Sequence, residues 1–158
     1  MRSAERSSIN QRRATSNLVL AVDPGRDKCG LAVVAQGGAI VARRVAQVAQ
    51  AQDVILDWAR AHQISTVVLG DSTTSREWQV RLAQWLPQAQ IFLVDERGST
   101  LEARTLYWQY HPPRGWRRLV PLSLQTPPEP IDDYAAVVLA RRFFNAERGS
   151  RNAEKSLP

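Results

Sequence analysis

Short apolar runs alternate along the chain with longer stretches in which apolar residues recur at helical spacing. Five runs have the length and flanking turn residues of strands, at residues 18–22, 30–35, 39–45, 65–69 and 90–94. Apolar positions three and four residues apart predict four helices, at residues 47–62, 75–86, 99–110 and 131–144. The adjacent glycines Gly37 and Gly38 predict a tight hairpin between the second and third strands.

The order of these elements limits the fold class. Three strands come first, joined by connections too short for a crossover helix, so they are expected to be antiparallel. Strands and helices then alternate, which favours an α/β fold with a mixed sheet flanked by helices. Prolines and arginines without a clear period predict a long loop over residues 112–130. Residues 17–146 are expected to form one domain, with a disordered basic arm at 1–16 and a flexible tail at 147–158.

Charge points to a polyanionic partner. The net charge is +6 and the isoelectric point is near 10.4, which favours nucleic acid. Nearly all of the 21 basic residues are arginines, which bind phosphate bidentately, although a genome rich in arginine codons would give the same ratio. No apolar run reaches the roughly 18–20 residues of a membrane span. The N-terminus lacks the apolar segment of a secretory signal, so a cytoplasmic protein without a membrane partner is expected. The single cysteine, Cys29, excludes a disulfide framework and is interpreted as a packed residue.

Three acidic residues are candidates for a catalytic site. Asp23 follows the first apolar run, Glu96 follows the fifth, and Asp132 opens the last helix. Ligands of such sheets bind outside the carboxyl ends of the strands, so these side chains could meet there. Carboxylate oxygens are the ligands that Mg²⁺ prefers. Two such ions roughly 4 Å apart can activate a water and stabilise the leaving oxygen in phosphodiester hydrolysis.

Spacing leaves several of these roles open. Asp23 alone would also suit an ordinary turn. Either Asp132 or Asp133 could cap the last helix while the other faces a metal. Asp95 competes with Glu96, because neighbouring side chains on a strand point to opposite faces and only one of the two can face the site.

Basic residues form a second set of candidates. Arg26 and Arg97 lie beside the acidic motifs and could contact phosphates or make surface ion pairs. A tryptophan among arginines in the long loop could stack on an unpaired base while the arginines hold the backbone. A loop that merely packs this tryptophan against the body is the alternative. The residues concerned are Arg114, Trp116, Arg117 and Arg118.

Four segments together resemble a known family. They are AVDPGRDKCGLAVV, VVLG, VDERGSTLEAR and IDDYAAVVLARRFF, which span about residues 18 to 145. In this order and spacing they resemble the YqgF family of RNase H-like nucleases, a group associated with Holliday-junction resolution and with trimming of the small-subunit ribosomal RNA precursor. The resemblance implies an RNase H-like fold, and it assigns the metal-binding and catalytic roles to Asp23, Glu96 and Asp132. Two departures, the DSTTS segment after VVLG and the composition of residues 107–130, indicate a distinct branch.

The function that the resemblance implies is a Mg²⁺-dependent nuclease, with Mn²⁺ as a possible substitute, acting on structured RNA such as the ribosomal RNA precursor. A resolvase of four-way DNA junctions is one alternative and predicts a dimer. A non-catalytic RNA-binding factor of ribosome assembly is another. The sequence leaves open RNA or DNA, endonuclease or exonuclease, and monomer or homodimer.

Overall fold

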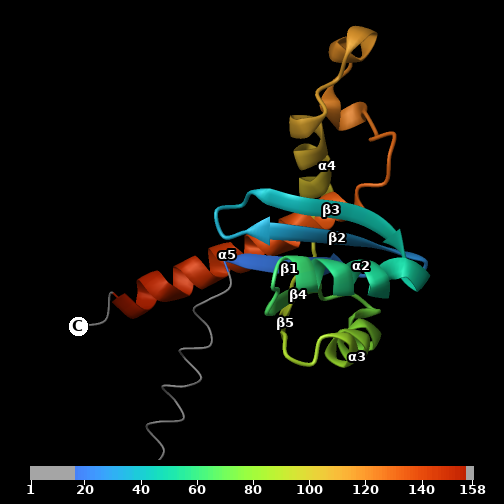
Figure 1. Ribbon diagram of the computed structural model, residues 1–158. Helices are drawn as coiled ribbons and strands as arrows, with labels where there is room; N and C mark the ends of the chain where they lie inside the picture. The colour runs from blue at the N-terminus through green and yellow to red at the C-terminus, as the bar shows by residue number, and fades with distance from the viewer. Residues whose placement is uncertain (1–16, 156–158) are drawn as a thin grey trace, which may run out of the picture.

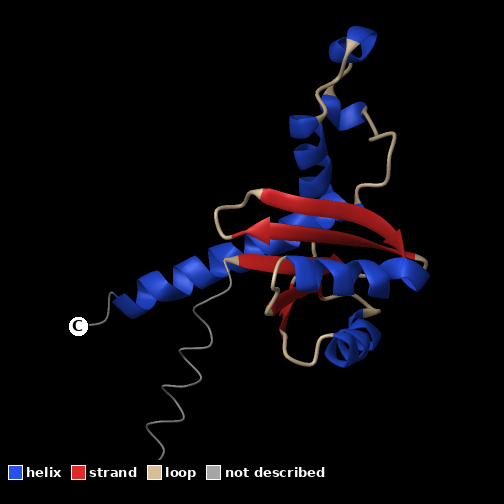
Figure 2. Ribbon diagram, viewed as in Figure 1, coloured by secondary structure: helices blue, strands red, loops and turns tan. Residues whose placement is uncertain are grey.

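A five-stranded mixed sheet forms the centre of the protein (Figure 2). The structure, a computed structural model, describes residues 17–155, with side chains through residue 153. The strand order is β3-β2-β1-β4-β5; β1, β2 and β3 are antiparallel, and β4 and β5 run parallel to β1. The strands are β1 (Leu18–Asp23), β2 (Lys28–Ala35), β3 (Ile40–Gln47), β4 (Thr66–Gly70) and β5 (Gln90–Val94). The predicted mixed α/β sheet is confirmed, whereas the predicted arm at 1–16 lies outside the described residues.

Helices cover both faces of the sheet (Figure 1). They are α2 (Val48–Ala61), α3 (Ser75–Trp85), α4 (Ser99–Tyr110) and α5 (Asp132–Lys155). Successive side chains of a strand point to opposite faces. Val19 and Ala21 therefore pack with α4 and α5, while Leu20 and Val22 pack with α2 and α3. A strand buried on both sides needs apolar residues at every position, which explains the continuous run LVLAV.

The tryptophans and the cysteine have packing roles. Trp78 is fully buried and meets the edge of Trp85 with ring centroids 6.3 Å apart. Trp58 and Trp85 are partly buried against the same cluster. Cys29 is buried, and its burial, with the nearby charges of Asp23 and Asp132, raises the pKa of its thiol to about 12. The thiol is therefore protonated at neutral pH and unsuited to nucleophilic attack.

The last helix is longer than the sequence pattern predicts. Apolar spacing fades after Phe144, but α5 continues to Lys155, so residues 147–155 of the expected tail are helical. The segment from Asn145 to Lys155 contains Ala, Glu, Arg and Lys, which favour helix, and no proline. Periodicity reports the buried face of a helix, so it does not register a helix end that extends past the core.

The predicted long loop contains two short 3₁₀ turns, η1 (Gly115–Leu119) and η2 (Leu122–Leu124). Figure 1 shows this segment projecting from the end of α4. Gln125 holds its shape by donating hydrogen bonds of 2.8 Å from Nε2 to the carbonyls of Arg117 and Val120. His111 anchors its base through a 3.0 Å hydrogen bond between Nε2 and the Tyr134 hydroxyl. Within residues 17–155, none of the helices is both long enough and apolar enough to cross a membrane.

Candidate active site

Asp23 ends the central strand β1 between two glycines of the neighbouring strands. It pairs with Gly30 of β2, and on the other side Gly70 follows Leu69, the partner of Val22. Strand alternation turns Asp23 toward the face covered by α4 and α5. Because the two flanking glycines lack side chains, other groups can approach Asp23 closely on this face.

The start of α5 fills the space over Gly30. A Cβ atom at Gly30 would lie 1.8 Å from the backbone oxygen of Asp132. Such an approach is open only to glycine, so residue 30 determines how closely the first turn of α5 sits on the sheet. Ala135 and Ala136, both buried, allow the helix to continue at this short distance.

The Glu96 side chain fills the space over Gly70. A Cβ atom at Gly70 would lie 2.8 Å from Glu96 Oε2 and 3.1 Å from Pro24 Cδ, next to Asp23. Asp95 instead points to solvent, where its Oδ2 lies 2.8 Å from Arg97 Nη2. Of the two acids that follow β5, the structure therefore places Glu96 beside Asp23.

Asp132 and Asp133 point in different directions. Asp132 Oδ2 lies 3.4 Å from the Nζ atom of Lys28 at the start of β2. Asp133 is buried, forms an ion pair with Arg43 of β3, and accepts the backbone N–H of Tyr134 at 2.9 Å. Asp133 thus fastens the helix start to the sheet, and Asp132 is the one that lies toward Asp23.

The charges of Glu96 and Asp132 both act on Asp23. Burial, followed by the charges of Glu96 and Asp132, raises the pKa of Asp23 to about 7. Burial also raises the pKa of Glu96, with further contributions from Asp71 and Asp95. A divalent ion beside Asp23 would offset the neighbouring negative charges that raise its pKa.

Metal coordination would require a local rearrangement. Among residues 17–153, no three Asp, Glu, His or Cys side chains lie close enough together, as they stand, to hold an ion. The donor set nevertheless fits Mg²⁺, because all three groups offer carboxylate oxygens at one end of the sheet. Lys28 at present supplies the positive charge beside Asp132.

Two neighbours of the site were missed by sequence reasoning. Asp71 comes directly after β4, much as Asp23 stands at the end of β1, and after burial its charge contributes most to the raised pKa of Glu96. Lys28 pairs with Asp132 across about a hundred residues of sequence. The position of Asp71 at a parallel strand end was a usable signal, whereas no local pattern marks Lys28.

The basic candidates are all exposed but differ in their contacts. Arg97 donates from Nε to both Asp95 carboxylate oxygens. It therefore makes a surface ion pair, which was one of the two roles that the sequence suggested for it. Arg26 lies exposed in the β1–β2 loop, close in sequence to Asp23. Trp116 is 73% exposed, so it does not pack against the body. The exposed arginines beside it are Arg114, Arg117 and Arg118.

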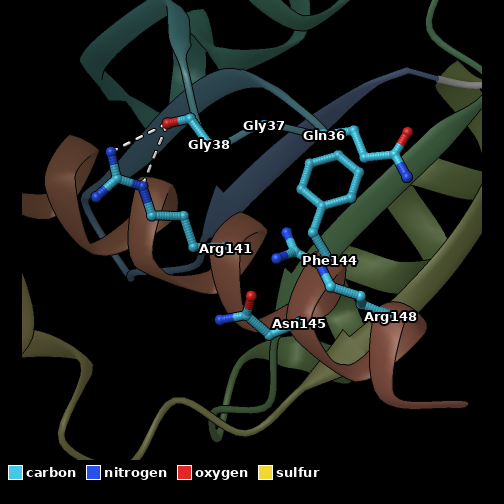
Figure 3. A pocket seen from close by; sticks show the side chains of 7 residues that line it. All are labelled: Gln36, Gly37, Gly38, Arg141, Phe144, Asn145 and Arg148. Carbon is cyan, nitrogen blue, oxygen red and sulfur yellow. Dashed lines mark hydrogen bonds between the residues drawn. The ribbon is translucent and has the colours of Figure 1, made fainter. Parts of the chain in front are cut away.

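A small hollow at the β2–β3 hairpin is separate from the acids. Its volume is about 190 Å³, and it lies between the hairpin glycines and the middle of α5, where Arg141 is one of the lining residues (Figure 3). Arg141 donates to the Gly38 carbonyl from Nη2 at 3.0 Å and from Nε at 3.3 Å. This contact fixes the hairpin to α5, so Arg141 has a structural role there.

Replacing Gly30 with Ala should destabilise the protein by at least about 1–3 kcal/mol, because the new methyl group would overlap the Asp132 backbone and displace α5. Gly37→Ala is the matched control, since a Cβ atom there meets nothing within 4 Å and should change stability by less than about 0.5 kcal/mol. Urea denaturation measures both. Equal stabilities for the two variants would contradict the close approach of α5.

Comparisons with known proteins identify the family and the fold. The model of the family described as the Tex protein YqgF-like domain matches residues 17–106. No curated protein sequence matches the chain significantly.

A structure of Thermus thermophilus RuvC in complex with a Holliday junction substrate is similar, with a TM-score of 0.55 and 16% identity over 84% of this chain and 96% of that chain. A second Thermus thermophilus RuvC structure gives 0.52 and 18% over the same shares. At these identities the likeness shows the fold alone, which is RNase H-like. Because the family model covers more than half of its residues, the chain belongs to the family of Tex-type YqgF-like domains.

Proposed function

We propose that the protein is a Mg²⁺-dependent nuclease that cleaves structured RNA, such as a ribosomal RNA precursor. The observation that carries this proposal is the group of three carboxylates around the end of β1, in which Asp23 has a pKa raised to about 7 by burial and by its two acidic neighbours. A half-buried acid kept among like charges is unfavourable in itself, and strongly perturbed groups of this kind occur at functional sites.

Asp23, Glu96 and Asp132 would hold the metal ions, with Mn²⁺ as a possible substitute. When bound, the ions would activate a water and stabilise the leaving oxygen of the phosphodiester. Asp23 is the central member, because it lies between the other two. Lys28, once Asp132 turns to the metal, would be free to contact a phosphate oxygen. Asp133, held by Arg43, would keep the first turn of α5 in place.

Cleavage of matched substrates tests this proposal. A ribosomal RNA precursor, an RNA duplex and a four-way DNA junction would each be incubated with Mg²⁺, with Mn²⁺ and with chelator. Metal-dependent cleavage of RNA in preference to the junction is expected. Preferential cutting of the junction would instead favour the resolvase, and a dimer in sedimentation would accompany it.

A non-catalytic RNA-binding factor is the second candidate. Two observations favour it. No three acidic, histidine or cysteine side chains among the described residues lie close enough together to hold an ion, and Lys28 forms an ion pair with Asp132. Tight RNA binding without cleavage at any Mg²⁺ or Mn²⁺ concentration would support it.

The exposed arginines of the loop should dominate the salt dependence of binding. Replacing Arg117 and Arg118 together with Ala should reduce the slope of log affinity against log salt by about 1.4–1.8, because each phosphate contact contributes about 0.7–0.9. Arg81→Ala is the control, since Arg81 is paired with Glu77 at 2.5 Å on α3. Titrations between low and moderate salt measure the slopes. A change no larger than that of the control would remove these arginines from the interface.

A further inference from the structure

The hollow at the β2–β3 hairpin, called the hairpin hollow below, is basic. Figure 3 shows the hairpin on one side of it and the side chains of α5 on the other. Its volume of about 190 Å³ equals that of roughly six waters at ~30 Å³ each. This is room for a phosphate group, whereas small-ligand pockets begin at about 300 Å³. None of the described residues that line it is acidic, and its polar side chains belong to Gln36, Arg141, Asn145 and Arg148.

Two arginines of the hairpin hollow carry charges that no acid in the described part of the chain neutralises. Arg142 shows the contrast, since its Nη2 lies 2.5 Å from Glu102 Oε1. Arg141 and Arg148 take part in none of the ion pairs that the described residues form. Arg141 donates to the Gly38 carbonyl from Nε and Nη2, which leaves its Nη1 for another acceptor. Because like charges beside one hollow repel each other, an anion between them would be bound favourably.

The other polar side chains of the hairpin hollow suit the same anion. Gln36 and Asn145 offer amide N–H donors, and both are exposed, as is Arg148. A ligand from solvent can therefore reach all three. Phosphate oxygens of nucleic acids accept hydrogen bonds from arginine, asparagine and glutamine side chains, and arginine binds them bidentately.

A second hollow connects the hairpin hollow with the loop that carries Glu96. It lies between α4 and α5, has a volume of about 320 Å³, and shares Arg141 and Asn145 with the hairpin hollow. Arg142 also lines it and donates hydrogen bonds to the two carbonyls that flank Glu96. Polar side chains therefore continue from the hairpin across α5 to the backbone beside the candidate active site.

We propose that the hairpin hollow binds a backbone phosphate of the nucleic-acid substrate, at a distance from the bond that is cleaved. Arg148 and the Nη1 group of Arg141 hold the phosphate oxygens. These residues follow Asp132 by nine and sixteen positions along α5, which is about 14 and 24 Å at 1.5 Å per residue. At about 3.4 Å per nucleotide of a duplex strand, the contact lies roughly four to seven nucleotides from the acids.

This inference rests on the proposed function, because it takes nucleic acid as the substrate. It adds a contact that takes no part in the chemistry. The phosphate is bound alike before and during cleavage, so losing the contact should raise KM and leave kcat unchanged. The enzyme would therefore favour substrates that extend several nucleotides to one side of the cleaved bond.

The test measures RNA binding in chelator, where no cleavage occurs. Arg148→Ala removes one of the two charges, and Gln36→Glu brings a carboxylate that would pair with the arginines in place of a phosphate. Each variant should bind an RNA duplex about 5- to 8-fold more weakly at about 0.1 M salt. The slope of log affinity against log salt should fall by about 0.7–0.9, the value of one phosphate contact.

Arg60→Ala is the matched control. Arg60 is exposed on α2, on the opposite face of the sheet, and it also takes part in none of the described ion pairs. It should bind RNA like the parent. An Arg148→Ala protein that binds no more weakly than Arg60→Ala would overturn the proposal, since net charge alone would then explain any loss.

Inorganic phosphate separates the two sources of the anion. Suppose that it raises the thermal stability of the parent but not of Arg148→Ala, while both bind RNA equally. The hollow would then be a site for the free anion, and the proposal would again be overturned.

The outcomes also separate this inference from the proposed function. Metal-dependent cleavage with the same KM in the parent and in Arg148→Ala would reject the phosphate site and leave the nuclease intact. Weaker RNA binding by Arg148→Ala and Gln36→Glu, without cleavage by the parent at any metal concentration, would support the site and reject the nuclease.

Discussion

Asp23→Asn should lose metal-dependent cleavage by at least about 100-fold, because a catalytic metal contributes several kcal/mol and each 1.36 kcal/mol is a factor of ten. Asn has nearly the shape of Asp but cannot supply the negative charge that a divalent ion needs between Glu96 and Asp132. RNA affinity in chelator should not fall, since Asp23 repels rather than attracts phosphate. Initial cleavage rates at saturating Mg²⁺ measure the effect.

Asp53→Asn is the control for that experiment. Asp53 is exposed on α2, on the opposite face of the sheet. Its replacement removes the same charge as Asp23→Asn, but far from the candidate site. It should cleave like the parent. An Asp23→Asn protein that cuts as fast as Asp53→Asn would remove Asp23 from the mechanism.

The second large effect is on stability and its dependence on pH. Asp23 has a folded-state pKa of about 7 against an ordinary pKa of 3.8, so between these two pH values the folded protein keeps a proton that the unfolded chain has released. The free energy of unfolding therefore falls as pH rises through this window, by up to about 1.4 kcal/mol per pH unit. The contribution is fully present below pH 3.8 and is lost above pH 7. Without metal, the parent should be about 2–3 kcal/mol less stable at pH 8 than at pH 5 through this group.

Comparison with Asp23→Asn isolates this contribution. The variant carries no titrating group at residue 23, so the difference in unfolding free energy between variant and parent should grow from pH 5 to pH 8. Urea denaturation in chelator measures it. Mg²⁺ at pH 8 should stabilise the parent, since a ligand that binds only the folded state raises its stability, and should stabilise the variant much less. A pH-independent difference would show that Asp23 is not buried among charges.

Local sequence pattern identified most of the elements for a simple reason. The strands β1, β2 and β4 contain continuous apolar runs because helices cover both faces of the sheet there, and α4 begins and ends at the predicted residues 99 and 110. The predicted end of the last helix, residue 144, was wrong. Residues 147–155 of α5 extend past the core, so they show no apolar periodicity. The two 3₁₀ turns were not predicted, since runs of three to five residues have no readable periodicity.

The site residues likewise divide into what the sequence could select and what only the structure explains. Position at a strand end or helix start was enough to select Asp23, Glu96 and Asp132 as candidates, because element ends can be located in the sequence. The choice of Glu96 over Asp95 came from the family resemblance, and the structure supplies the physical reason, that Glu96 lies over Gly70 while Asp95 pairs with Arg97.

By itself, the sequence determined a mixed α/β sheet, a basic surface and a set of acids at the ends of its elements, since these depend on local periodicity and composition. Only the tertiary structure decided which groups meet. It placed Asp132 on Gly30, turned Asp133 to Arg43, and paired Lys28 with Asp132. These contacts join residues far apart in the chain, and they depend on distances that no local pattern encodes.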